Sequence, residues 1–199
     1  PFTGGFNFAR TQWVDWDSDG DVDLFVLDED LKFRYFLNAG NVSEENFILY
    51  PHPIQKLSGM GWFFMDDFND DGSIDLVTQS NIDASQVIYY EFDGLEFNFH
   101  SVLMQVTDMP LISSPVMTPT FADIDNDGDL DFFVGNTIGT VNFYENLNSD
   151  SGAPVFEFIS SFWQDIFITG PSQQRHGASA ITFIDLDGDE DLDLAWGDY

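Results

Sequence analysis

The 199-residue sequence contains no cysteine, only five lysine and arginine residues, and no long apolar run. The absence of cysteine excludes disulfides and thiol catalysis. Because 36 acidic residues give a net charge of −31, we expect the surface to repel nucleic acid and anionic lipid. No apolar stretch approaches the ~20 residues that span a bilayer, so we expect no direct membrane insertion.

The residues that are abundant indicate a folded protein in spite of this charge. Hydrophobic residues make up 43% of the chain, and 22 of them are phenylalanine. A chain of this length and composition can bury a sizeable core. Most of the acidic residues are concentrated in four short segments, and these segments need a specific explanation.

Each acidic segment places oxygen-bearing side chains at its first, third, fifth, seventh and ninth positions, directly before an apolar run. Carboxylates this close oppose one another's ionisation unless a cation neutralises them. Ca²⁺ is a hard ion that accepts oxygen ligands in flexible geometry, so it is the predicted cofactor. The predicted metal ligands are Asp15, Asp17, Asp19, Asp21 and Asp23; Asp67, Asn69, Asp71, Ser73 and Asp75; Asp123, Asp125, Asp127, Asp129 and Asp131; and Asp185, Asp187, Asp189, Asp191 and Asp193.

The position of glycine distinguishes the fourth segment from the other three. A glycine at the sixth position permits the positive φ of a sharp turn, and Gly20, Gly72 and Gly128 meet this requirement. The fourth segment has Glu190 there, while Gly188 lies two residues earlier. A non-glycine residue in the left-handed region costs on the order of 1 kcal/mol. The sequence therefore predicts three well-formed Ca²⁺ sites and a fourth that is distorted, weaker or shifted.

An EF-hand shares the first half of this pattern and is the main alternative. That motif requires an acid at the twelfth position and helices on both sides. The twelfth residues here are Val26, Thr78, Val134 and Trp196, each in an apolar run that reads as a strand. The EF-hand interpretation therefore fails in every copy.

The spacing of the segments predicts a repeat architecture. They begin at residues 15, 67, 123 and 185, which suits a propeller blade of four strands. Strand-like segments lie on both sides of each acidic loop, and alternating segments at 32–37, 87–92 and 141–146 supply a third strand. Segments at 46–50, 96–102 and 155–160 supply a fourth, and no convincing helix is present. The predicted fold is all-β, with propeller blades of four antiparallel strands.

The number of predicted blades is incomplete. We divide residues 1–199, a single propeller segment, into units at about 11–61, 62–117, 118–179 and an incomplete 180–199. These units give about three and a half blades, and a propeller must close to protect its edges. We expect an excerpt of a larger propeller. The alternatives are an arc completed by another chain and a four-bladed ring that borrows a strand, for instance from residues 1–10.

Two of the acidic segments carry a recognisable family pattern. Residues 15–24 read Asp-x-Asp-x-Asp-Gly-Asp-x-Asp-Leu, and residues 123–132 read Asp-x-Asp-x-Asp-Gly-Asp-Leu-Asp-Phe. These patterns resemble FG-GAP/VCBS repeats, and residues 142–146 followed by 154–156 resemble the bacterial form. The resemblance implies the calcium-binding blades of integrin-α-like propellers and of secreted bacterial proteins. It therefore implies Ca²⁺ in the hairpin loops and an extracellular or cell-surface location.

Two functional classes remain open at this stage. We favour a non-catalytic, calcium-binding module for surface adhesion, protein–protein interaction or assembly, in which Ca²⁺ stabilises the hairpins. Its partner would be a protein, a glycan, or further copies or segments of the same protein that complete the propeller. The alternative is the propeller domain of a secreted polysaccharide-active lyase or hydrolase, or a glycan-binding module. The sequence contains no catalytic constellation, which favours the first class.

Histidine and tryptophan residues supply no stronger site. The histidines fall at unrelated places in the repeat and outside any nucleophile or zinc signature, so we expect them to pack at blade edges. Arg175 and His176 lie in a polar segment near Ser172, which leaves a binding loop as an alternative there. The tryptophans are interpreted mostly as blade packing, with an exposed subset able to stack on sugars. The residues concerned are His52, His100 and His176, and Trp13, Trp62, Trp163 and Trp196.

Overall fold

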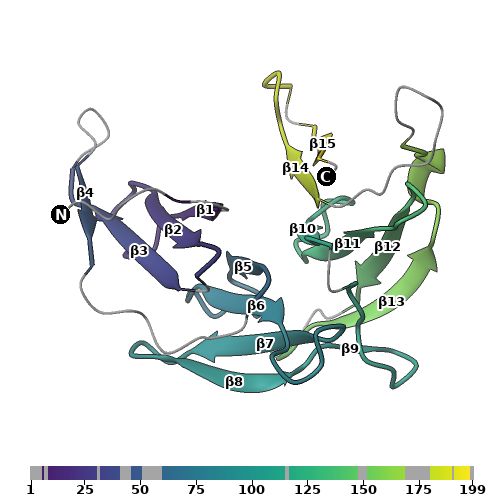
Figure 1. Cartoon of the computed structure of the whole chain (residues 1–199), viewed down its shortest axis with the longest axis horizontal. Coiled ribbons are helices and arrows are strands. Elements are labelled where there is room, and N and C mark those ends of the chain that lie inside the picture. Colours follow the sequence, from purple (N-terminus) through teal and green to yellow (C-terminus); the bar gives the residue numbers. More distant parts are fainter. Residues whose placement is uncertain are drawn as a thin grey trace.

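The computed structural model describes residues 6, 9–30, 32–40, 46–50, 60–114, 117–147, 152–168, 180–189 and 191–197, and its strands form four β-sheets (Figure 1). The only helical element in these residues is a single 3₁₀ turn, η1 (Trp163–Asp165). The predicted all-β fold is therefore confirmed. None of the described segments forms an apolar helix long enough to cross a membrane. The sequence features noted at His52, 172–176 and Glu190 lie outside the described residues.

The first two sheets each contain four antiparallel strands in sequence order, as predicted. An acidic loop joins the first two strands of each sheet. The first sheet comprises β1 (Arg10–Val14), β2 (Asp23–Leu27), β3 (Phe33–Asn38) and β4 (Phe47–Leu49), and the second comprises β5 (Phe63–Asp66), β6 (Asp75–Gln79), β7 (Val87–Phe92) and β8 (Phe97–Val102).

The third sheet repeats this arrangement and adds a fifth strand, and the fourth sheet has two strands within the described residues. The extra strand, β9, comes from the segment after the second sheet and pairs in parallel with the outer strand of the third. The elements are β9 (Met104–Gln105), β10 (Thr120–Ala122), β11 (Asp131–Gly135), β12 (Val141–Asn146), β13 (Val155–Ser160), β14 (Ala180–Ile184) and β15 (Asp193–Gly197).

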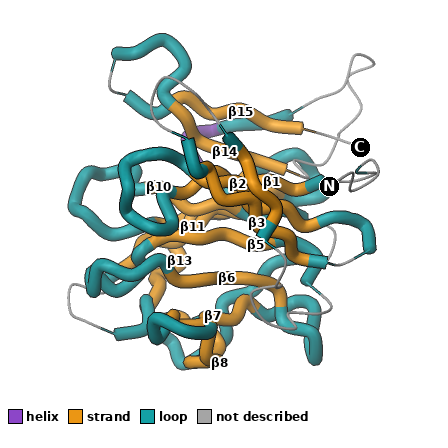
Figure 2. Tube along the Cα trace, turned by 90° about the vertical axis from the view of Figure 1, so that its left-hand side faces the viewer, coloured by secondary structure: helices purple, strands orange, loops and turns teal. Residues whose placement is uncertain are grey.

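The sheets follow one another along an open arc (Figure 1). Strands β1, β5, β10 and β14 line the inner side of the arc, whereas β4, β8 and β13 lie on its outer side. Neighbouring inner strands are in contact, as in β1 with β5 and β10 with β14. Figure 2 shows the strands crossing the molecule, with loops and turns at their two ends. The arrangement is propeller-like, and the described sheets do not close into a ring.

Residues near the start of the chain do not complete the last sheet in the part that the structure describes. Arg10 instead begins β1, where it pairs with Leu27 of the first sheet. The ring of Phe6 contacts Phe36 of the same sheet edge-on. Residues 1–5, 7 and 8 lie outside the described residues. The division into units ending at 61, 117 and 179 stays a prediction.

The hydrophobic core lies between successive sheets. One cluster fills the space between the first and second sheets and includes Phe25 and Met65. A second includes Trp62 and Phe132 and joins the second sheet to the third. A third cluster packs Phe133 and its neighbours against β14 and β15. Because neighbouring sheets pack face to face, the hairpin loops are left at the ends of the strands.

Candidate metal centre

Each predicted metal-binding segment forms the hairpin loop between the first two strands of a sheet. The ninth residue of each loop is the first residue of the second strand, where it pairs with the last residue of the first strand. These pairs are Val14–Asp23, Asp66–Asp75, Ala122–Asp131 and Ile184–Asp193. The same hairpin therefore presents the same acidic positions in all four sheets.

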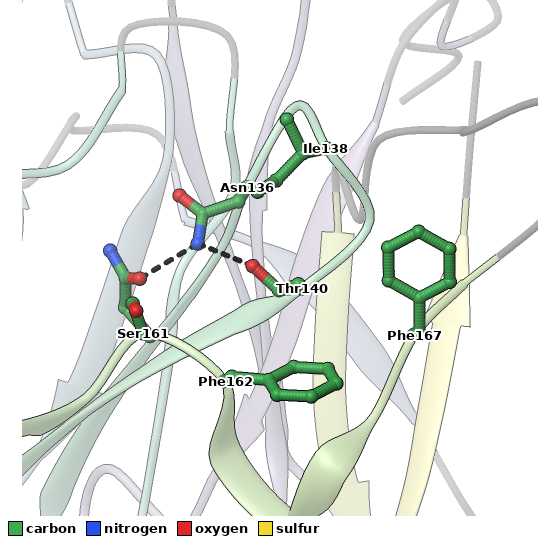
Figure 3. A pocket seen from close by; sticks show the side chains of 7 residues that line it. Asn136, Ile138, Thr140, Ser161, Phe162 and Phe167 are labelled. Atoms are coloured by element: carbon green, nitrogen blue, oxygen red, sulfur yellow. Dashed lines mark hydrogen bonds between the residues drawn. The ribbon is translucent and has the colours of Figure 1, made fainter.

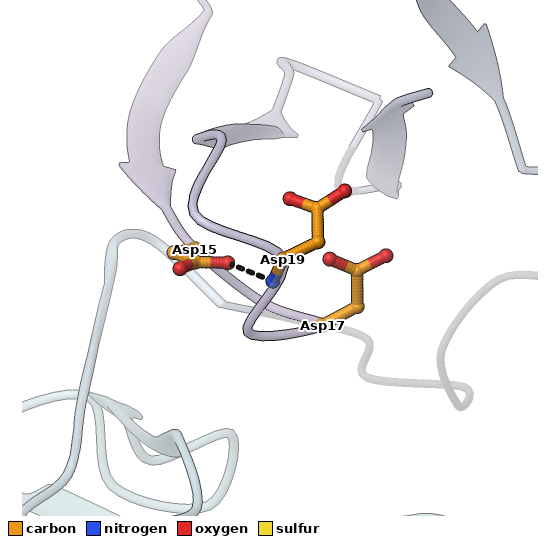
Figure 4. A group of neighbouring side chains, drawn as sticks. All are labelled: Asp15, Asp17 and Asp19. Atoms are coloured by element: carbon orange, nitrogen blue, oxygen red, sulfur yellow. Dashed lines mark hydrogen bonds between the residues drawn. The ribbon is translucent and has the colours of Figure 1, made fainter. Parts of the chain in front are cut away.

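The first carboxylate of the loop organises its backbone. In the first loop, both oxygens of Asp15 accept hydrogen bonds of 3.1 Å, Oδ1 from the Asp19 N–H and Oδ2 from the Gly20 N–H. Figure 4 shows the Asp19 bond, with the carboxylates of Asp17 and Asp19 side by side. Asp67 and Asp123 accept the equivalent pair of bonds in the second and third loops. The loops thus share a common hydrogen-bonded frame.

Two positions of the loop have positive φ, and the glycine pattern of the sequence predicts one of them. The glycines at the sixth position have φ of 92°, 85° and 99°, as predicted. The fourth position is also left-handed, although no glycine occupies it in these three loops. Its residues are Ser18, Asp70 and Asn126, with φ of 59°, 55° and 60°. Asp and Asn tolerate this conformation better than most residues, which is the sequence signal that was missed.

The fourth loop uses its glycine differently. Gly188 has a φ of 79° and lies at the fourth position, where the other loops have Ser, Asp or Asn. Its N–H donates to Asp185 Oδ1 at 2.7 Å, and the Asp189 N–H donates to the same atom at 3.2 Å. The fourth loop therefore keeps the hydrogen bond from its fifth residue, as in the other loops, and adds one from the glycine at its fourth position. A weaker fourth site stays a prediction.

Several predicted ligands converge in the structure. One oxygen or more from each of three acids lies within 4.8 Å of the others in the first, third and fourth loops. In the second loop, Asn69 replaces an acid, and its Oδ1 accepts a 3.1 Å bond from the Asp71 N–H. Oxygen donors at this separation suit Ca²⁺. The converging acids are Asp15, Asp17 and Asp19; Asp123, Asp125 and Asp127; and Asp185, Asp187 and Asp193.

Comparison with protein families gives two overlapping matches to the FG-GAP-like repeat, at residues 67–134 and 123–196. Each match begins at the first acid of a loop and extends through the next loop, and together they cover more than half of the chain. The chain belongs to the FG-GAP-like repeat family. No curated protein matched the sequence significantly. The first loop lies outside the matched residues, yet it has the same hydrogen-bonded frame as the FG-GAP loops that follow.

The seventh residue of each FG-GAP loop is fixed through its backbone. Its N–H donates to the carboxylate at the fifth position over 2.8–3.0 Å in all four loops. This bond sets the direction of the peptide at the seventh position, where we expect the backbone carbonyl to serve as a ligand. The residues concerned are Asp21, Ser73, Asp129 and Asp191. Their role, like that of all twenty predicted ligands, stays a prediction.

The ninth carboxylate of three FG-GAP loops is buried, a feature that the alternating acidic pattern does not predict. In each of these loops its Oδ1 accepts a backbone hydrogen bond from the end of the third strand of the same sheet. Asp23 accepts from the Asn38 N–H at 2.7 Å, and Asp131 accepts from the Asn146 N–H at 2.8 Å. Asp75 accepts from Phe92 in the same way. These side chains therefore join the acidic loop to the body of the sheet.

Burial of these carboxyl groups raises their pKa. Desolvation brings the pKa of Asp75 to about 6 and that of Asp131 to about 7. The hydroxyl of Tyr89 donates to Asp75 Oδ2, which lowers the pKa of Asp75 in part. Among the described residues, Asp131 Oδ2 has no hydrogen-bond partner of normal geometry, although the Ile124 N–H weakly favours its charged form. A bound cation would compensate this buried oxygen, so the donor set fits Ca²⁺.

Other residues singled out by the sequence lie away from the loops. Trp62 is buried in the core, and Trp163 packs against Phe133, as predicted for blade packing. Trp13 and Trp196 are instead more than half exposed, because no sheet covers them in the described part of the chain. The ring of His100, on the outer strand β8, lies against the ring of Tyr89 at an angle of 58° (the centroids lie 5.3 Å apart), which agrees with a packing role at a blade edge.

Proposed function

We propose that this FG-GAP chain is a non-catalytic, extracellular calcium-binding propeller segment that serves adhesion, protein interaction or assembly. One observation carries the proposal. The same acidic hairpin, with the same frame of backbone hydrogen bonds to its first carboxylate, recurs in the first three sheets. In the third, it leaves the buried Asp131 Oδ2 without a proper partner. A divalent cation bound in each loop would neutralise its carboxylates, and in the third loop it would also give Asp131 Oδ2 a partner.

The role of this calcium is structural. Each loop connects two strands of one sheet, and its ninth carboxylate is tied to the third strand, so a bound ion would hold three strands together. A ligand set supplied mainly by protein leaves little open coordination for chemistry. Extracellular modules bind Ca²⁺ with Kd values of ~10⁻⁴–10⁻³ M. At a hundredfold excess over Kd, one site stabilises the fold by ~2.7 kcal/mol.

The first sheet supports a partner that extends the propeller. In the first sheet Trp13 pairs with Leu24, and these two residues occupy the positions that Phe121 and Phe132 occupy in the third sheet. Phe121 is 4% exposed because it packs against the second sheet, whereas Trp13 is 53% exposed. The equivalent face is thus covered in one sheet and uncovered in the other. We propose that a further FG-GAP blade of the same protein covers it.

Calcium-dependent melting tests the proposal. The dialysed, metal-free chain is titrated with CaCl₂ while its melting temperature is measured, and Mg²⁺ serves as the ionic-strength control. We expect Ca²⁺ to raise the melting temperature by several degrees, and Asp127→Asn to remove part of that gain. Glu157→Gln, which neutralises an exposed acid on β13, is the matched control. Equal melting curves with and without Ca²⁺ would refute the proposal.

Turnover assays address the enzymatic alternative. We expect the chain to cleave none of a panel of polysaccharides in reducing-sugar and unsaturated-uronate assays. Sustained turnover by the purified chain that disappears on heat denaturation would contradict the non-catalytic assignment.

A further inference from the structure

A shallow cavity of about 450 Å³ lies at the end of the third sheet (Figure 3). It is lined by the turn between β11 and β12 and by the segment that follows β13. The metal loop at 123–131 precedes β11, and the turn at 136–140 follows it, so the cavity and the loop lie at opposite ends of this strand. Small-ligand sites of ~300–1,000 Å³ are typical of proteins.

One side of the cavity carries a fixed set of polar groups. The two N–H bonds of Asn136 Nδ2 are directed at Thr140 Oγ1, at 2.9 Å, and at Asn142 Oδ1, at 2.7 Å. The Asn136 backbone N–H also donates to the Thr140 carbonyl at 2.8 Å and closes the turn. Within the described residues, these bonds engage Asn142 through its oxygen alone. Its NH₂ group therefore remains a donor for a ligand, held in place before binding.

The other side of the cavity presents aromatic rings on a fixed backbone. Phe162 and Phe167 are each 43% exposed, and Figure 3 shows both rings beside the turn. The residue after Phe162 is Trp163, whose ring packs into the core between the third and fourth sheets. At the other end of the segment, the Ile168 N–H donates to the Gly139 carbonyl at 2.7 Å. Both ends of the segment are thus anchored, which limits the entropy lost on binding.

The charge of the lining indicates the class of ligand. None of the seven described residues that line it is charged, although the chain carries a net charge of −31. An anionic ligand would be repelled by the overall field, and a cationic one would be drawn to the acidic loops instead. A neutral ligand with both hydroxyl groups and an apolar face fits the amide donor and the aromatic rings together. Pyranose sugars have these two features.

We propose that this cavity binds a neutral saccharide, which stacks on Phe162 and accepts a hydrogen bond from Asn142. The inference rests on the proposed non-catalytic binding role and names the ligand class for it. A proline-rich peptide is the main competitor, because such peptides dock on aromatic grooves. The backbone carbonyls of such a peptide would also accept a bond from the Asn142 amide, so the experiment below has to separate the two ligands.

Saturation-transfer NMR tests the inference on the calcium-loaded chain, with the methyl glycosides of glucose, galactose and mannose as probes. We expect at least one glycoside to bind, with its affinity lowered about tenfold by Phe162→Ala. Phe162→Leu should lower the affinity by a similar factor, because leucine keeps apolar bulk but has no ring face. Asn142→Asp should also weaken binding, since it replaces a donor with a charged acceptor. Phe99→Ala, at an exposed ring on β8, is the control and should bind normally.

The outcomes separate this inference from the calcium proposal. No glycoside binding by a chain whose melting still responds to Ca²⁺ would overturn the saccharide site and leave the calcium role standing. Unchanged affinity in Phe162→Leu, or binding of a proline-rich peptide alone, would also overturn it. Glycoside binding by a chain that is indifferent to Ca²⁺ would support the site and refute the calcium role.

Discussion

Replacement of Asp131 by asparagine should have opposite effects in the absence and presence of calcium. Asp131 is 2% exposed, and burial raises the pKa of its carboxyl group from 3.8 to about 7. Asparagine keeps the Oδ1 acceptor for the Asn146 N–H and removes the ionisable group. The substitution should therefore relieve charge in the metal-free protein and remove a ligand from the calcium-bound one.

The magnitude follows from the pKa. A rise from 3.8 to about 7 corresponds to an ionisation cost on the order of 4 kcal/mol in the folded protein. Because the pKa of Asp131 is higher in the folded protein, its protonated carboxyl contributes its full stabilisation below the unfolded pKa of 3.8. This stabilisation is lost as the pH rises through about 7. Asp131→Asn avoids this ionisation cost, but the buried asparagine amide offsets about 1–3 kcal/mol of the benefit. Metal-free Asp131→Asn should thus be about 1–3 kcal/mol more stable than the parent chain at pH 8.

Urea denaturation followed by tryptophan fluorescence measures the effect at pH 4.5, 6 and 8, with and without Ca²⁺. At pH 4.5 the advantage of metal-free Asp131→Asn should disappear, because the parent carboxyl is protonated in the folded protein and only the cost of the buried amide remains. With saturating Ca²⁺ at pH 8 the order should reverse, because the parent chain gains up to ~2.7 kcal/mol per site at a hundredfold excess over Kd. An equal loss of stability in Asp131→Asn under all six conditions would refute this reasoning, since it would show a purely structural role.

Four further substitutions test other parts of the structure by the same denaturation assay. Gly128→Ala should cost on the order of 1 kcal/mol, because φ is positive there while no atom lies within 4 Å of the added Cβ; a neutral result would contradict the strained turn. Trp62→Ala should cost about 3–5 kcal/mol, since Trp62 is fully buried. Trp13→Ala should cost less than half as much, and equal losses would show that its face is covered. Gln12→Ala should cost about 1–2 kcal/mol, because its side chain bonds both the N–H and the carbonyl of Met65 in the next sheet; Thr11→Ala is the control on the same strand.

Local patterns explain why much of the fold could be predicted. Alternation of aromatic and polar residues marks a half-buried strand, and β7, β12 and β13 have the predicted bounds. The short β9 was not predicted, because two residues carry no periodicity. Its pairing with β13 depends on where the third sheet lies relative to the second.

Some features of the candidate site are likewise local in the sequence, and others depend on how the sheets pack. The alternating acids and the glycines at the sixth position are local features, so the sequence by itself determined which residues form the loop and where its chain must turn. Burial depends on which sheets surround a residue, and a sequence pattern does not contain that information. The tertiary structure therefore decided that Asp23, Asp75 and Asp131 lie in the interior and that Trp13 stays exposed. It also brought Phe162 beside Asn136, because only the packing of the third sheet places the segment after β13 against the β11–β12 turn.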